Sequence, residues 1–167
     1  GQLEDMLNII MLASAVDEFE YCVYNGVTPS GEAKTYTQND YDTLFTSILS
    51  LYGLSSNSSN YWRSVAIRSS GYYISYAMSA LPCVELLSVA ETEGFEAAKA
   101  IYFKFFTFTD DPNNYEVDSD GDKTATLTFG ETLNYVGLHS VFDEEMYTHI
   151  SSYFCGVEKD FSYPDAE

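Results

Sequence analysis

Apolar residues recur at steps of three and four along most of this chain, and the longest such run extends from Leu3 to about Tyr24. Acidic residues fill the positions between them, which is the pattern of a helix with one buried and one solvated face. The pair Asn25-Gly26 ends the run, because glycine readily adopts the left-handed conformation of a helix C-cap. The sequence therefore predicts a long amphipathic helix. Its apolar members are Leu3, Met6, Leu7, Ile10, Ala13, Val16, Phe19 and Val23.

The same periodicity predicts a mostly helical chain beyond residue 24. Further helices are expected at residues 40–52, 71–93, 95–106, 129–136 and 144–154, with 61–67 either helical or extended. Residues 109–123 are expected to form a loop, and no segment has the pattern of a convincing strand. A chain of 167 residues can bury one substantial core. The expected fold is a single all-α domain over residues 1–167, an array of six or seven helices.

Capping residues indicate where several of these helices begin or bend. Thr37 or Asn39 can cap the second helix, and Thr128 can cap the helix expected at 129–136. The side-chain oxygens of these residues can accept hydrogen bonds from the first turn of a helix. Pro82 lies inside the third long helix, where it removes one backbone hydrogen bond. A kink is therefore expected near residues 78–82.

The net charge narrows the range of partners. The chain has 26 acidic and 7 basic residues, which give a formal charge of −19 at pH 7. Such a surface repels nucleic-acid phosphates and anionic lipids, so no nucleic acid is expected to bind.

The longest apolar runs are shorter than the roughly 18 residues that a membrane helix needs, so no membrane span is expected in this chain.

The N-terminus and the composition bear on localisation. Gly1 and Gln2 precede a helical pattern with neither a basic region nor an apolar leader core, so no signal peptide is expected within these residues. The acidity and the abundance of Tyr, Asn and Ser suit a secreted or cell-surface bacterial protein. A cytoplasmic location is the alternative.

Three cysteines, Cys22, Cys83 and Cys155, are far apart and show no metal-binding spacing. They form neither a zinc ribbon nor a disulfide framework. Cys22 and Cys83 fall within helical patterns and are expected to act as small buried apolar residues. One disulfide remains open as an alternative, and it would leave one thiol free.

Only two histidines occur, His139 and His149, and neither belongs to an HExxH motif or a hydrolase triad. His149 follows Glu145 by four residues on the last expected helix, a spacing that could bind a metal. A surface contact between the two is the favoured interpretation.

Asp118, Asp120 and Asp122 alternate within the expected loop. Carboxylates at this spacing can surround a calcium ion, which takes about six to eight oxygen ligands. The EF-hand pattern is not met, because glycine falls at the fourth position instead of the sixth. A solvated acidic loop is therefore favoured, with a calcium-bound structural domain as the alternative.

The stretch GYYISYAMSALP at residues 71–82 brings three phenols to the start of a helix otherwise built for close packing. On a helix, Tyr72 and Tyr76 share a face, and so do Tyr73 and Tyr76, with Cβ atoms about 5–6 Å apart. The three hydroxyls could therefore meet at one ligand. Alternatively, the rings fill a core and their hydroxyls bond to whatever lies near.

Six parts of this chain, taken in the order in which they occur, carry a resemblance to a known protein family. They are ASAVDEFEYCVY at 13–24, LYGL at 51–54, Trp62, GYYISYAMSAL at 71–81, EGFEAAKAIYFKFF at 93–106 and TFGETLNYVGLHSVFDEE at 128–145. Together they resemble the C-terminal part of the M3 family of zinc metallopeptidases, the relatives of oligoendopeptidase F and thimet oligopeptidase. The resemblance covers about residues 10–155.

The resemblance implies a helical catalytic domain in which zinc is held by the two histidines of HExxH and a downstream glutamate. This chain has no HExxH, so zinc is expected in the complete parent protein and not on this chain. The zinc-binding segment is expected upstream of Gly1 in the same protein. The resemblance also implies a peptide substrate, with the hydroxyls of Tyr73 and Tyr76 donating to the tetrahedral intermediate, Tyr72 in reserve, and Gly71 and Tyr72 near the substrate backbone.

One departure from the family pattern affects this interpretation. Members generally carry a histidine eleven or twelve residues before the second tyrosine, where this chain has Ser64 and Val65. Two functions therefore stay open. The chain is either the C-terminal portion of an oligoendopeptidase or a noncatalytic acidic helical binding module that contacts its ligand through exposed tyrosines and Trp62.

Overall fold

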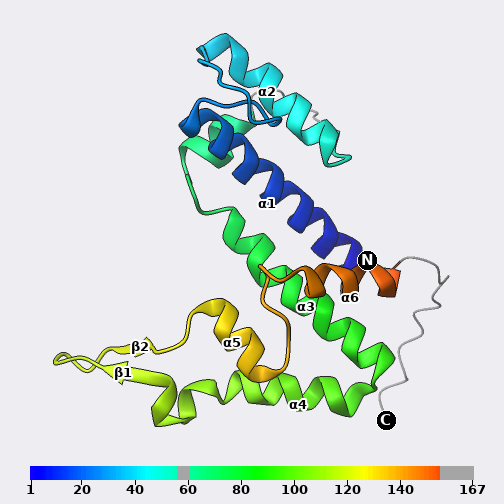
Figure 1. Ribbon diagram of the computed structural model, residues 1–167, viewed down its shortest axis with the longest axis vertical. Helices are drawn as coiled ribbons and strands as arrows, with labels where there is room; N and C mark the ends of the chain where they lie inside the picture. The colour runs from blue at the N-terminus through cyan, green and yellow to red at the C-terminus, as the bar shows by residue number, and fades with distance from the viewer. Residues whose placement is uncertain (56–60, 155–167) are drawn as a thin grey trace. The chain divides into compact units, whose positions relative to one another are not determined.

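The computed structural model describes residues 1–55 and 61–154 of the chain, so Cys155 lies outside the described residues (Figure 1). The described chain contains six α-helices, one short π-helix and a single pair of strands, which confirms the predicted all-α class. It divides into two compact units, Gly1–Cys83 and Val84–Glu167, where the sequence predicts one domain. The boundary falls inside helix α3, Ile74–Thr92.

The first unit is built on helices α1, Gln2–Asn25, and α2, Gln38–Leu51, which lie side by side (Figure 1). As predicted, Gly26 ends α1 in the left-handed conformation, with φ 63°. Thr37, and not Asn39, caps α2: its backbone N–H donates to Asp40 Oδ2 at 2.8 Å, and its hydroxyl also donates to that oxygen. These hydrogen bonds, chiefly the one from the hydroxyl, lower the pKa of Asp40.

The core of the first unit is aromatic. The ring of Phe19 meets that of Phe45 edge to face, with centroids 5.2 Å apart, and lies 5.8 Å from Trp62. Trp62 precedes a π-helical turn, Arg63–Ile67, and its indole N–H donates to Asp42 Oδ1 at 2.6 Å. The ambiguous segment is therefore helical. Trp62 is only 4% exposed, so the prediction that it contacts a ligand is wrong.

The second unit contains the C-terminal part of α3 and three further helices, which begin and end where the sequence predicts. They are α4, Phe95–Phe106, α5, Phe129–Val136, and α6, Glu144–Phe154. Helix α5 packs on α4, and Gly137 ends α5 with φ 105°. Thr128 caps α5, because its side-chain oxygen accepts the backbone N–H of Glu131 at 3.3 Å. Thr128 in turn donates its hydroxyl and its backbone N–H to Glu131 Oε2, and these hydrogen bonds, chiefly that of the hydroxyl, lower the pKa of Glu131.

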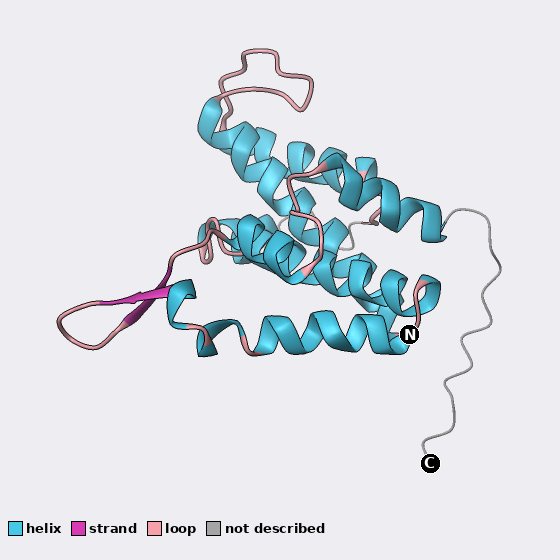
Figure 2. Ribbon diagram, turned by 60° about the horizontal axis from the view of Figure 1, so that its bottom comes forward, coloured by secondary structure: helices cyan, strands magenta, loops and turns pink. Residues whose placement is uncertain are grey.

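Between α4 and α5 the prediction of a strandless loop is wrong. Two 3-10 turns, Phe108–Asp110 and Pro112–Asn114, lead into an antiparallel hairpin of β1, Tyr115–Val117, and β2, Lys123–Ala125, drawn in magenta in Figure 2. Each strand has three residues and no buried face, so neither shows the apolar alternation by which a strand is recognised.

The two described cysteines differ in exposure. Cys22 is buried, as predicted, and burial raises the pKa of its thiol, but Cys83 is exposed, so its predicted burial is wrong.

Among the described helices, α3 alone is long and apolar enough to cross a membrane, a test that the core helix of a soluble protein also passes. The predicted lack of a membrane span stays a prediction.

Candidate functional site

Two of the three clustered tyrosines precede helix α3 instead of belonging to it. Gly71 has φ 67° and its N–H donates to Glu20 Oε2 at 3.0 Å, which holds the chain in a turn. Tyr72 and Tyr73 continue this turn, and α3 begins at Ile74, three residues later than the sequence predicts. The left-handed glycine cannot belong to the helix, which explains the later start.

The three phenol rings nevertheless converge, as their spacing predicts. The ring centroid of Tyr76 lies 5.2 Å from that of Tyr72 and 5.7 Å from that of Tyr73. The hydroxyl of Tyr76 donates to that of Tyr72 at 3.2 Å. This hydrogen bond is the main cause that raises the pKa of Tyr76, so its phenol stays protonated as a neutral donor.

Exposure separates the members of this cluster. Tyr72 is 54% exposed and Tyr76 is 42% exposed, so the two rings and their paired hydroxyls face solvent. Tyr73 is half-buried against the aromatic core of the first unit. The pKa of Tyr61 is raised mainly by burial and, to a smaller extent, by the neighbouring Tyr73. The accessible pair is therefore Tyr72 and Tyr76, while Tyr73 anchors the turn.

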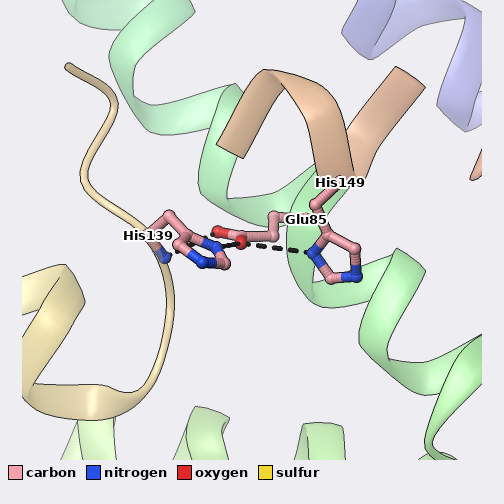
Figure 3. Close-up of side chains that lie close together, drawn as sticks. All are labelled: Glu85, His139 and His149. Atoms are coloured by element: carbon pink, nitrogen blue, oxygen red, sulfur yellow. Dashed lines mark hydrogen bonds and ion pairs between the residues drawn. The ribbon is translucent and has the colours of Figure 1, made fainter. Parts of the chain in front are cut away.

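A second cluster lies within the second unit and was not predicted (Figure 3). Helix α3 supplies Glu85, the segment after α5 supplies His139, and α6 supplies His149. Their ligand atoms all lie within 4.8 Å of one another. Together these residues form the one such group of three or more His, Cys, Asp or Glu side chains in residues 1–55 and 61–154.

Glu85 is the centre of this cluster, and it is fully buried. Its Oε2 accepts the backbone N–H of His139 at 3.1 Å. Its Oε1 faces both imidazoles: it lies 3.4 Å from Nδ1 of His149 and forms a close hydrogen bond with Nδ1 of His139. The hydroxyl of Ser88, one turn further along α3, lies 3.4 Å from Nε2 of His149.

A cavity of about 560 Å³ opens beside the two histidines. It is lined mostly by acidic and polar residues, namely Glu93, His139, Glu144, Glu145, Thr148, His149 and Ser152. Glu145, the expected partner of His149, lines this cavity, but Nδ1 of His149 faces Glu85 Oε1, at 3.4 Å. The predicted pairing of Glu145 with His149 is therefore replaced by a longer-range one.

The three aspartates considered for calcium lie at the turn of the β1–β2 hairpin. Asp118 Oδ1 accepts the backbone N–H groups of Asp120 and Asp122, each at 2.9 Å. The carboxylate thereby stabilises the turn itself, which gives this spacing a structural role. Calcium binding at these residues stays the alternative to a solvated loop.

The sequence contained a signal for the cluster that was missed. Glu85 is the only charged residue between positions 69 and 90, within an otherwise apolar or neutral stretch. A carboxylate in the buried part of a helix requires partners, because an unpaired buried charge is strongly unfavourable. The partners themselves lie 54 and 64 residues away, so the sequence alone does not name them.

The chain was compared with known proteins at three levels. No protein-family model matches it, and no match was found among curated proteins or solved structures. The family resemblance therefore stays a prediction. The Glu85, His139 and His149 cluster does not fit the zinc site that this resemblance implies, because its histidines are ten positions apart and no HExxH is present.

Proposed function

We propose that this chain is the C-terminal portion of a zinc-dependent oligoendopeptidase, in which it forms one wall of the peptide cleft and supplies tyrosine hydroxyls to the tetrahedral intermediate. The observation that carries the proposal is the exposed pair of Tyr72 and Tyr76, whose hydroxyls lie 3.2 Å apart. The order of the sequence stretches supports it. The zinc itself would be held by another segment of the same protein.

The chemistry of this pair suits the proposed role. An oxyanion is stabilised best by donors that are fixed before the reaction begins. The anchoring of Tyr73 in the core and of Gly71 on Glu20 holds the turn that carries Tyr72. Since Tyr76 donates to Tyr72, the proton of the Tyr72 hydroxyl is free to point toward a substrate, and the two groups reinforce each other.

Exposed aromatic residues on α4 also support a chain that packs against a further segment. Phe103 is 52% exposed and Phe106 is 71% exposed, and the ring of Phe106 stacks on that of Tyr102. Large exposed apolar side chains that gather on one element are typical of an interaction surface.

The acidic binding module is the second candidate function. Its support is the net charge of −19 together with exposed tyrosines, among them Tyr21 and Tyr24 on α1. It predicts that the chain binds a cationic peptide without cleaving it. Its ligand contacts would have to come from tyrosines alone, because Trp62 is buried.

Peptide cleavage by the complete protein tests the first proposal. Replacing Tyr72 with phenylalanine should lower kcat for an internally quenched peptide by about 100- to 1,000-fold, the usual loss for one oxyanion donor. Tyr76→Phe removes only the hydrogen bond to the Tyr72 hydroxyl and should have a smaller effect. Tyr21→Phe is the matched control, because Tyr21 is 62% exposed and lies outside the cluster, and it should leave kcat unchanged. Equal kcat in wild type, Tyr72→Phe and Tyr76→Phe would contradict the proposal, and binding without cleavage would favour the acidic module.

A further inference from the structure

We propose that Glu85, His139 and His149 form a binding site for a divalent transition-metal ion of the zinc class. This inference goes beyond the proposed function, because none of the three residues takes part in it. It rests on the identity of the donor atoms, their separation, the burial of Glu85 and the acidic cavity beside the histidines.

The donor set is one that zinc prefers. Two imidazole nitrogens and one carboxylate oxygen are a common set of three protein ligands for zinc, with a fourth position left for water. Oxygen-rich sites suit calcium and magnesium instead, because these ions take carboxylate, carbonyl and water ligands. The two histidines of this cluster therefore point to a transition metal.

The separations are close to what such an ion requires. Bonds of about 2.0–2.1 Å in a tetrahedral site place neighbouring ligand atoms roughly 3.4 Å apart. Oε1 of Glu85 already lies 3.4 Å from Nδ1 of His149. Metal binding requires that the imidazole of His139 move away from Oε1, to which it is hydrogen-bonded. His139 lies outside any helix, so a small movement of this kind disturbs little regular structure.

Surrounding groups hold the proposed ligands in place. The backbone N–H of His139 occupies Oε2 of Glu85, which leaves Oε1 as the oxygen for the ion. The hydroxyl of Ser88 contacts the ring of His149 at Nε2, the nitrogen opposite Nδ1. Hydrogen bonds of this kind orient metal ligands and typically change affinity by about 10- to 100-fold.

Charge and access favour a cation. Glu85 is fully buried, and a bound cation supplies the positive charge that a carboxylate loses when it is removed from water. The neighbouring cavity carries three further carboxylates, those of Glu93, Glu144 and Glu145. Walls of one charge sign raise the local concentration of the opposite ion, and the cavity provides room for a water ligand.

Cobalt titration of the full chain tests the site. The metal-free protein is titrated with Co²⁺ while visible absorption is recorded, because tetrahedral cobalt with nitrogen and oxygen ligands gives a distinct band, and Zn²⁺ is then added to displace it. One ion per chain is expected at the band's saturation. His149→Ala should weaken binding by at least about 100-fold, and Ser88→Ala by about 10-fold.

A matched control separates this site from general attraction to an acidic surface. Glu96→Gln removes one exposed carboxylate from α4 and should leave cobalt affinity unchanged. Circular dichroism verifies the fold of each variant, and Ser88→Ala provides the test if His149→Ala loses helicity. Absence of the cobalt band in the wild-type chain, or equal affinity in wild type, His149→Ala and Ser88→Ala, would overturn the proposal. Neither result depends on peptidase activity.

Discussion

Replacing Phe45 with alanine is expected to lower the free energy of unfolding by about 3–5 kcal/mol. Phe45 is fully buried on α2, and its ring meets that of Phe19 edge to face at 5.2 Å. Truncation removes this contact and leaves a cavity that the surrounding helices cannot fill completely. Urea unfolding followed by circular dichroism measures the loss.

Leu51 on the same helix is the control for this substitution. It is 69% exposed, so Leu51→Ala should change the free energy of unfolding by less than about 0.5 kcal/mol. A loss for Phe45→Ala as small as the loss for Leu51→Ala would mean that the aromatic cluster is not the core of the first unit.

Replacing Glu85 with alanine is expected to cost a similar amount, about 3–5 kcal/mol, in the second unit. Two effects add. The substitution deletes a fully buried side chain, and it removes the acceptor of the His139 N–H together with the shared partner of both imidazoles. Glu85→Gln keeps the shape and one oxygen that can accept the backbone N–H of His139, so it should cost less than Glu85→Ala.

Glu96 provides the matched control for Glu85. Its side chain is 81% exposed and forms only a surface ion pair with Lys99 at 3.4 Å. Glu96→Ala should therefore change the free energy of unfolding by less than about 1 kcal/mol. If both substitutions had equally small effects, Glu85 would not be the buried centre of the second unit.

Much of the helical architecture could be predicted because its signals are local. Helix α5 begins after Thr128 and ends at Gly137, and both residues act through contacts within a few positions. The apolar repeat of α1 ends at a left-handed glycine. The hairpin at 115–125 could not be predicted in this way. Its strands are short and exposed, and the side chain that stabilises its turn, Asp118, also matches the pattern of an ion-binding loop.

The candidate sites show the same contrast between local and long-range signals. Tyr72, Tyr73 and Tyr76 are close in sequence, so their convergence followed from spacing, although their unequal exposure depends on the core beneath Tyr73. Glu85 meets His139 and His149 only because the segment after α5 and helix α6 come to lie beside Glu85 in the folded chain. An unaccompanied carboxylate in an apolar helix indicates that a partner exists, but not which residue it is.

The affinity of a phosphinic peptide, which imitates the tetrahedral intermediate, tests the proposed role of the tyrosine pair most directly. In the complete protein, Tyr72→Phe should weaken inhibitor binding by about 100- to 1,000-fold while KM for the matching substrate changes little, because the hydroxyl acts on charge that only the intermediate carries. Tyr21→Phe should bind the inhibitor like wild type. Unchanged inhibitor affinity in both Tyr72→Phe and Tyr76→Phe would contradict the account.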